Sequence, residues 1–303
     1  MTAVGRSFRV GKERGGFPIA FLVICRAFSN RIGAKHPMRQ LIKPAIAALG
    51  AVILGVFAES SAIAVDHNNV DANRPLSFDD AESIGLREQS LEVGVGVTKP
   101  RGRTVGGEFE VEYLYGFAPN THLNIGIDPS VGGRTNREDT RFDPGNVSVG
   151  VFHNFNREYN NTPAFAVRAD ASLPTGRNSR GVDFRLRGIA SKTIGQYDRL
   201  HLNLDLNVNT EAEEDDRDVV PGVVLGYSRP LGYPRRFDRT ILAEVGVRGS
   251  EEKGTDAIVS AGIGLRQQVG YQSVLDIGLQ SDFAGDRRDR NDVRFIAGYS
   301  IAF

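Results

Sequence analysis

The sequence predicts an all-β fold, a transmembrane antiparallel up-and-down β-barrel of about twelve strands. From residue 90 onward, apolar and polar residues alternate with a period of two, as they do in strands with two different faces. No segment of 90–303 shows the 3.6-residue period of an amphipathic helix. A secretion signal precedes these segments, and the last of them ends on an aromatic residue, Phe303.

The alternation places strands in order along the chain. They are expected near 90–98, 107–117, 121–128, 146–155, 164–173, 183–193, 200–209, 219–228, 240–249, 257–267, 273–282 and 293–303. The clearest is LHLNLDLNVN at 200–209, where Leu and Val side chains share one face and His, Asn and Asp side chains share the other. Which residues of 219–228 and 257–267 point into the barrel is the least defined, because the alternation of apolar and polar residues is least regular there.

The connections between these strands also alternate. Those after even-numbered strands are mostly short or moderate, whereas those after odd-numbered strands include the longest and the most charged. An even number of strands of about 9–11 residues, with short turns at one end and longer loops at the other, is typical of outer-membrane barrels. A soluble barrel would alternate in the same way, but it would not explain the secretion signal, the aromatic residues at strand ends or the aromatic last residue.

Residues 38–64 have the anatomy of a secretory signal peptide. Arg39 and Lys43 form a basic start, and 45–58 is an apolar run that is too short for a typical membrane helix. Such a signal directs export, so we expect the rest of the chain to reach the outer membrane of a Gram-negative bacterium.

The expected cleavage site follows the apolar run. Ala62 and Ala64 supply the small residues that signal peptidase requires, which places the cut before Val65. We expect residues 1–37 to be an over-extended start of the reading frame, with Met38 as the initiator.

Residues 65–89 are polar and acidic and show no strand alternation. They form either a periplasmic leader or a plug folded into the lumen, and the sequence leaves both open. The barrel itself is expected to span 90–303.

Charge and cysteine content exclude several classes of protein. Residues 1–64 hold nine of the 37 basic and two of the 37 acidic residues, which leaves the rest of the chain with a net charge of −7. An acidic body argues against a nucleic-acid partner. Cys25 is the only cysteine, and no metal-ligand spacing, phosphate loop or dinucleotide motif is present. We therefore expect no cofactor, no metal site and no catalytic residue.

If the apolar faces of the strands meet lipid, their polar faces line the lumen. The charged residues expected there are Glu108, Glu110, Glu112, Arg168, Asp170, Arg185, Arg187, Asp205, Glu244, Arg248, Arg266, Asp276 and Arg294. The run EFEVE at 108–112 is the best candidate for a selectivity filter, because three carboxylates on one face repel each other unless they are paired. For most of this set, salt bridges that fill the interior are the simpler interpretation.

The last strand carries a second set of expected functional residues. Phe295, Ala297, Tyr299, Ile301 and Phe303 share its apolar face. A terminal strand of this kind is the signal that the barrel-assembly machinery reads, so we expect that machinery and outer-membrane lipid to be partners of the chain. A closed barrel would also pair this strand with the first one and remove both edges.

Two stretches resemble a known family. FEVEYLYGFAPNTHLNIGI at 109–127 and ADASLPTGRNSRG at 169–181 resemble transporter-like outer-membrane proteins labelled “putative MetA pathway of phenol degradation”. The resemblance covers about 91–303. It implies a barrel that passes hydrophobic or aromatic compounds, and it supplies no catalytic or binding residues.

The sequence is therefore interpreted as an outer-membrane channel that passes a small-molecule solute by diffusion through a narrow polar lumen. A non-transporting structural or adhesive barrel is the alternative. An outer-membrane hydrolase is the third, but no constellation of Ser, His and an orienting group is visible. His122, His153 and His201 are expected to be ordinary lining residues.

Overall fold

The computed structural model describes residues 74–101, 105–132, 142–177, 179–232, 238–285 and 290–303. The predicted over-extended start at 1–37, the predicted signal peptide at 38–64 and its cleavage site at Ala62, Ala64 and Val65 lie outside these ranges. The described residues form thirteen strands: β1 (Gln89–Pro100), β2 (Gly106–Ala118), β3 (Thr121–Ile127), β4 (Ser130–Gly132), β5 (Val147–Asn156), β6 (Ala164–Leu173), β7 (Asp183–Ile194), β8 (Asp198–Asn209), β9 (Val219–Leu231), β10 (Arg239–Arg248), β11 (Ile258–Gly270), β12 (Ser273–Ala284) and β13 (Asn291–Ala302).

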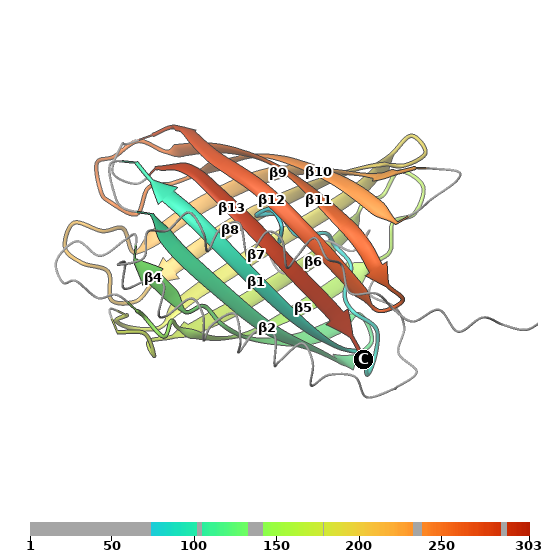
Figure 1. The fold of residues 1–303 in the computed structure, drawn as a ribbon, viewed down its shortest axis with the longest axis horizontal. Coiled ribbons are helices and arrows are strands. Elements are labelled where there is room, and N and C mark those ends of the chain that lie inside the picture. The colour runs from blue at the N-terminus through green and yellow to red at the C-terminus, as the bar shows by residue number, and fades with distance from the viewer. Residues whose placement is uncertain (1–73, 102–104, 133–141, 178, 233–237, 286–289) are drawn as a thin grey trace, which may run out of the picture. The chain divides into compact units, whose positions relative to one another are not determined.

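The strands make one closed antiparallel barrel (Figure 1). Apart from the short β4, each strand pairs with the strands before and after it in the sequence, and β1 pairs with both β2 and β13, which closes the sheet. β3 and the three-residue β4 follow one another along the same edge of β2, so they fill a single position in the wall. The prediction of an all-β, twelve-stranded, up-and-down barrel is confirmed.

The seam between the first and last strands is regular. Its register runs from Ser90 opposite Ala302 to Lys99 opposite Val293, and the Phe303 amide donates to the Gln89 carbonyl at 3.0 Å. The pairing satisfies the backbone groups that an open edge would leave free, as a structure surrounded by lipid requires.

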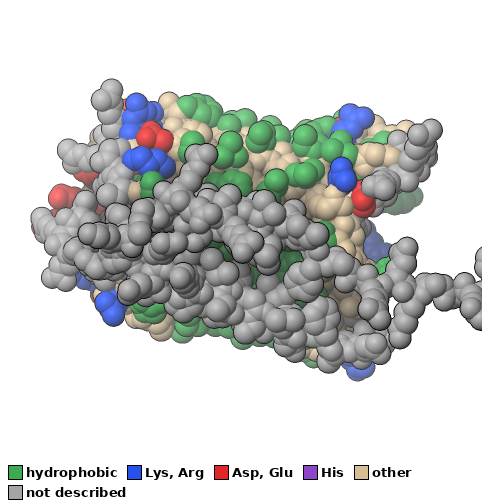
Figure 2. All heavy atoms as spheres, in the orientation of Figure 1, with side chains coloured by type: hydrophobic (Ala, Val, Ile, Leu, Met, Phe, Trp, Pro, Cys, Tyr) green, Lys and Arg blue, Asp and Glu red, His purple; other side chains and the backbone are tan. Residues whose placement is uncertain are grey.

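The two faces of the strands differ as the alternation predicts. On β8, His201 and Asn203 are fully buried, while Leu202 and Leu204 are 41% and 54% exposed. Figure 2 shows hydrophobic side chains along the middle of the visible wall, with Lys, Arg, Asp and Glu side chains toward its two ends. An apolar band of this size is costly in water but favourable in a bilayer.

The described residues contain no helix that is both long and apolar enough to cross a membrane.

Residues 74–88, which we call the inner segment, run through the interior of the barrel before β1 begins. Leu76 and Phe78 pack with Leu242 of β10, and the half-buried Val224 of β9 contacts this cluster. A second apolar cluster of the interior joins Ala81 to inward side chains of β5, β6 and β7: Phe152, Ala164, Ala166 and Ile189. The lumen is therefore not uniformly polar, because the wall carries apolar patches where the inner segment lies.

Candidate functional site

The candidate site is the lumen of the barrel together with the inner segment that occupies it. Glycines of the wall mark where that segment lies. A Cβ built on Gly278 would come within 2.2 Å of the Pro75 carbonyl oxygen, and one built on Gly116 within 1.9 Å of the Gly85 carbonyl oxygen. A Cβ built on Gly226 would likewise overlap the Phe78 ring, at 2.4 Å from its Cγ atom. These positions must lack a side chain because the inner segment passes directly over them.

The backbone of the inner segment is held by side chains of the wall at alternate residues. The Ser77 amide and hydroxyl both donate to Glu244 at 2.8 Å. The Asp79 amide donates to the Asn203 side-chain oxygen at 2.8 Å, and the Asn203 amide nitrogen donates back to the Asp79 carbonyl at 2.9 Å.

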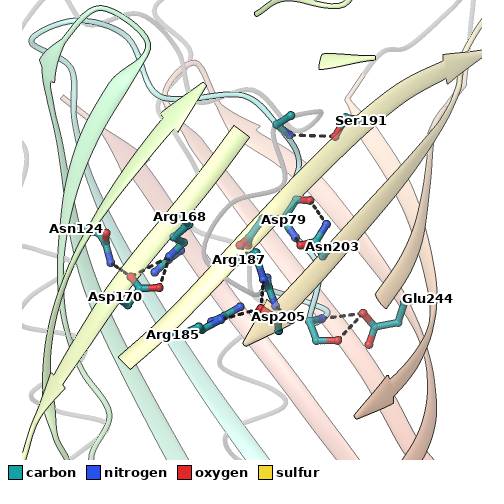
Figure 3. Close-up of polar contacts among 12 residues, drawn as sticks. Asp79, Asn124, Arg168, Asp170, Arg185, Arg187, Ser191, Asn203, Asp205 and Glu244 are labelled. Atoms are coloured by element: carbon teal, nitrogen blue, oxygen red, sulfur yellow. Dashed lines mark hydrogen bonds and ion pairs between the residues drawn. The ribbon is translucent and has the colours of Figure 1, made fainter. Parts of the chain in front are cut away.

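The next alternate residue, Ala81, continues this pattern. Its amide donates to the Ser191 hydroxyl at 3.0 Å, and its carbonyl accepts from Asn154. Alternate residues of an extended chain direct their backbone groups to the same side, so side chains of four wall strands, β10, β8, β7 and β5, satisfy one edge of the segment in turn. Figure 3 shows Asp79 between Asn203 and Arg187, with Ser191 and Glu244 on either side.

A buried ion pair also joins the inner segment to the wall. Arg187 of β7 donates to the Asp79 carboxylate at 2.8 Å, and both side chains are only 3% exposed. The same guanidinium donates twice to Asp205 of β8, at 2.7 and 2.8 Å, and Arg185 reaches Asp205 at 3.1 Å. The sequence prediction placed Arg185, Arg187 and Asp205 on the inner face, and the structure brings them together.

The three carboxylates of EFEVE each face a different arginine. Glu108 pairs with Arg294 at 2.9 Å, and Glu112 pairs with Arg168 at 2.8 Å. Glu110 lies 3.7 Å from Arg74 of the inner segment, which also pairs with Glu92 of β1. The repulsion expected within this run is therefore offset by pairing.

The remaining charged residues of the predicted set also lie on the inner face. Arg168 donates to Asp170 at 2.9 Å, and Asn124 donates to the same carboxylate at 2.9 Å (Figure 3). Arg266 and Asp276 are buried register partners on β11 and β12. Arg248 lies 4.0 Å from Asp282.

The sequence predicted that all three histidines line the lumen, but the structure places only His122 and His201 on the inner face. His122 is buried and stacks on Phe152, with ring centroids 4.7 Å apart. His201 is fully buried between two hydroxyls, with its Nδ1 2.9 Å from Ser191 and its Nε2 2.9 Å from Ser228. His153 lies on the outer face, because it alternates with buried Phe152 and Asn154.

The Ser191–His201–Ser228 contact was not visible in the sequence, because it joins three strands. Both ring nitrogens of His201 are engaged by hydroxyls, and the Phe78 ring covers the imidazole. A nucleophilic site would need an orienting group on one nitrogen and open space beside the serine. The geometry of the described residues fits a positioned ring better than a catalytic one.

A cavity of about 580 Å³ lies at the short-turn end of the barrel. The turns β2–β3, β5–β6 and β7–β8 line it, and Glu82 and Ser83 of the inner segment border it. Burial alone would raise the pKa of Glu158 in this lining, but hydrogen bonds from Lys192 and Thr193 outweigh it and lower the pKa. We call this cavity the vestibule.

The predicted assembly residues all lie on β13 or directly after it. Phe295 is 45% exposed, and Ala297, Tyr299, Ile301 and Phe303 follow it at alternate positions on the same outer face. Tyr299 and Ile301 oppose Val93 and Leu91 of β1 across the seam.

Comparisons with known proteins agree with this architecture. A family model described as “Putative MetA-pathway of phenol degradation” matches residues 80–294. An outer membrane channel from Pseudomonas putida F1 is 12% identical, with a TM-score of 0.57 over 74% of this chain and 98% of that chain. The NanC porin is 11% identical, with a TM-score of 0.51 over 70% of this chain and 98% of that chain.

At these identities the two solved structures establish the fold alone. The first is described as an outer membrane channel and the second as a porin. No curated protein sequence gave a significant match to the chain.

Proposed function

The chain belongs to the family described as “Putative MetA-pathway of phenol degradation”, and we propose that it is an outer-membrane channel for small hydrophobic or aromatic compounds. On this proposal the inner segment acts as a displaceable plug. One observation carries it: the barrel interior is wide enough to hold an extended polypeptide segment.

The width of the interior supports a passage. Barrels of eight strands are filled by their own side chains, whereas those of sixteen or more leave an aqueous channel. In this twelve-stranded barrel, a separate segment that includes the fully buried Leu76, Phe78 and Ala81 takes up part of the interior. Without the inner segment, the wall would enclose a bore about as wide as a peptide.

The attachment of the inner segment suits a plug that leaves and returns. From Ser77 to Ala81 its backbone bonds to wall side chains such as Glu244 and Asn203, and backbone bonds to β2 begin only near β1, where Arg87 and Glu88 pair with Gly116. The ion pair of Asp79 with Arg187 has Asp205 as an alternative partner for the guanidinium. When the segment leaves, water can take its place on these polar groups, so the opened wall stays solvated.

The vestibule gives a direction to the path. Short turns face the periplasm in outer-membrane barrels, and the vestibule lies at the short-turn end. Solute would enter between the longer loops, pass the inner segment and leave through the vestibule. In the opened lumen, the arginine-paired carboxylates of EFEVE would set a weak charge preference rather than a strict filter.

The predicted signal peptide and the last strand fit the same proposal. A signal peptide at 38–64 would deliver a mature chain that starts near Val65, and the outer face of β13 would provide the assembly signal. The localisation proposed is the outer membrane of a Gram-negative bacterium.

A non-transporting barrel is the second candidate, and the dense ion pairing around Arg187 and Arg168 favours it. In that case the inner segment would be a permanent part of the interior, comparable with the filled lumen of a smaller barrel. The two candidates differ in what happens when the segment is removed.

Liposome swelling distinguishes them. The full chain and a variant that lacks 75–82 are reconstituted at equal amounts of folded barrel, and arabinose uptake is followed. The channel proposal expects slow uptake with the full chain and at least tenfold faster uptake with the deletion. No uptake with either protein, both shown by heat-modifiable migration to be folded, would rule the channel out and support the structural barrel.

A further inference from the structure

We propose that the slot in the wall that holds the Phe78 ring is a binding site for a single apolar aromatic ring. On this proposal Phe78 competes for the slot from within the chain. The inference deepens the proposed channel function, since it names the class of solute that the lumen recognises, but binding in the slot does not require transport.

The slot is shaped for a flat ring. The Phe78 and His201 rings are stacked, with centroids 5.1 Å apart and planes 28° from parallel. On Gly226, a built Cβ would lie 2.4 to 2.6 Å from three atoms of the Phe78 ring, so only a residue without a side chain leaves room there. The wall of β8 and β9 therefore presents an imidazole face beside a gap about one ring thick.

The rest of the slot is apolar. Leu242 of β10 is fully buried in the cluster that holds Phe78, and Val224 of β9 packs against it. Leu76 completes the cluster, but it belongs to the inner segment and would leave with Phe78. The part that stays consists of His201, Gly226, Leu242 and Val224.

The imidazole is fixed in place independently of Phe78. Ser191 and Ser228 each contact one ring nitrogen of His201 at 2.9 Å, on β7 and β9. These two contacts hold the plane of the ring and occupy both of its polar atoms. His201 consequently offers the slot its aromatic face and no unoccupied nitrogen.

The inner segment does not depend on the Phe78 ring for its attachment. Ser77 bonds to Glu244 on one side, and Asp79 bonds to Asn203 and Arg187 on the other. The Phe78 side chain lies between these two anchored residues, and its benzyl group has the size of toluene. It occupies a place on the wall that a solute passing along the lumen would contact. A solute that binds the vacated slot also favours the displaced state of the segment.

The chemistry of the lining favours an apolar ring over a phenol. The four wall residues offer a π-face, two aliphatic side chains and a glycine backbone. A hydroxyl on the ring would lose its water without gaining a partner among them. Toluene is therefore expected to bind better than phenol, and a flat ring better than methylcyclohexane.

Binding of 4-fluorotoluene to the detergent-solubilised full chain, followed by ¹⁹F NMR, tests the proposal. Phe78→Ala empties the slot, and it should bind at least tenfold more tightly than the unaltered chain. Phe78→Leu keeps the slot filled, and Phe78→Ala with Gly226→Leu refills it from the wall, so neither should bind more tightly than the unaltered chain. Partition into detergent is the same for all four proteins, which makes the comparison a measure of the slot.

Competition in the Phe78→Ala protein identifies the chemistry. Unlabelled toluene should displace the probe at lower concentration than phenol or methylcyclohexane does. The proposal is overturned if folded Phe78→Ala gains no binding, if Gly226→Leu leaves that binding intact, or if methylcyclohexane competes as well as toluene. Arabinose uptake by the same proteins in liposomes is scored separately, so loss of transport with intact binding would refute the channel and leave the slot.

Discussion

Asp79 and Arg187 form a buried ion pair with a separation of 2.8 Å, and this contact joins the inner segment to strand β7 of the wall. The two residues are 108 positions apart in the sequence. Because Arg187 also holds Asp205, the guanidinium keeps one carboxylate whether or not the inner segment is in place.

Asp79→Asn should loosen the inner segment. Loss of one charge from a buried pair costs about 3–5 kcal/mol, and Asp205 lowers that cost by keeping Arg187 partly neutralised. We expect the open probability in planar bilayers to rise at least tenfold. Glu82→Gln is the matched control, because Glu82 is half exposed where it pairs with Arg199 and such pairs contribute about 0–1 kcal/mol. Equal effects of the two substitutions would contradict the role of the ion pair.

Gly278→Ala should push the inner segment off the wall. The added methyl would lie 2.2 Å from the Pro75 carbonyl oxygen, which is backbone and cannot rotate away. We expect chymotrypsin to cleave after Phe78 at least fivefold faster than in the unaltered chain. Gly188→Ala on β7 adds a methyl with nothing within 4 Å and should leave the cleavage rate unchanged. An unchanged rate in Gly278→Ala would show that the inner segment does not pass over Gly278.

Arg294→Gln should shift the ion selectivity of the lumen toward cations. Arg294 neutralises Glu108 at 2.9 Å, so its loss leaves one carboxylate of EFEVE without its arginine. The reversal potential in a KCl gradient should move toward the potassium value. Arg180→Gln is the control: it removes a charge from an exposed ion pair with Glu213 in the loops, and it should shift the reversal potential much less. A shift toward chloride would contradict a lumen position for Glu108.

Phe303→Ala should reduce assembly much more than it alters the folded barrel. Phe303 contributes an outward side chain after β13, and its amide bond to Gln89 survives the substitution. We expect severalfold less heat-modifiable barrel in cell envelopes but normal conductance per channel after refolding from denaturant. A normal amount of folded Phe303→Ala barrel in cell envelopes would show that Phe303 is not part of the assembly signal.

The wall of the barrel was predictable from the sequence because lipid on one side and a polar lumen on the other impose a period of two on every strand. The β8 run shows this clearly, since the residues of LHLNLDLNVN face outward and inward as the letters alternate. β9 was harder, because inward Val220 and Val224 interrupt the polar stripe, and Val224 packs against the apolar cluster around Phe78.

The path of the inner segment was not predictable from local sequence. Its contacts join Ser77 to Glu244 and Asp79 to Asn203 across 167 and 124 positions, and no periodicity encodes such pairs. One signal was present: Leu242, Ile189 and Phe152 are apolar residues on otherwise polar faces. Apolar residues that point into a wet lumen indicate that something apolar covers them, here Leu76, Phe78 and Ala81.

A reversible lock tests most directly whether the inner segment closes a channel. With Cys25→Ser as background, Phe78→Cys and Gly226→Cys place two thiols close enough to bond, since a Cβ on Gly226 would lie 2.4 Å from the Phe78 Cγ and a disulfide needs its Cβ atoms about 3.8 Å apart. Single-channel conductance is recorded before and after reduction, with each single-cysteine protein as a control. The account predicts a closed channel when oxidised and repeated openings within minutes of reduction, in the double variant alone. Equal conductance in the oxidised and reduced protein, with the disulfide verified by mass spectrometry, would contradict it.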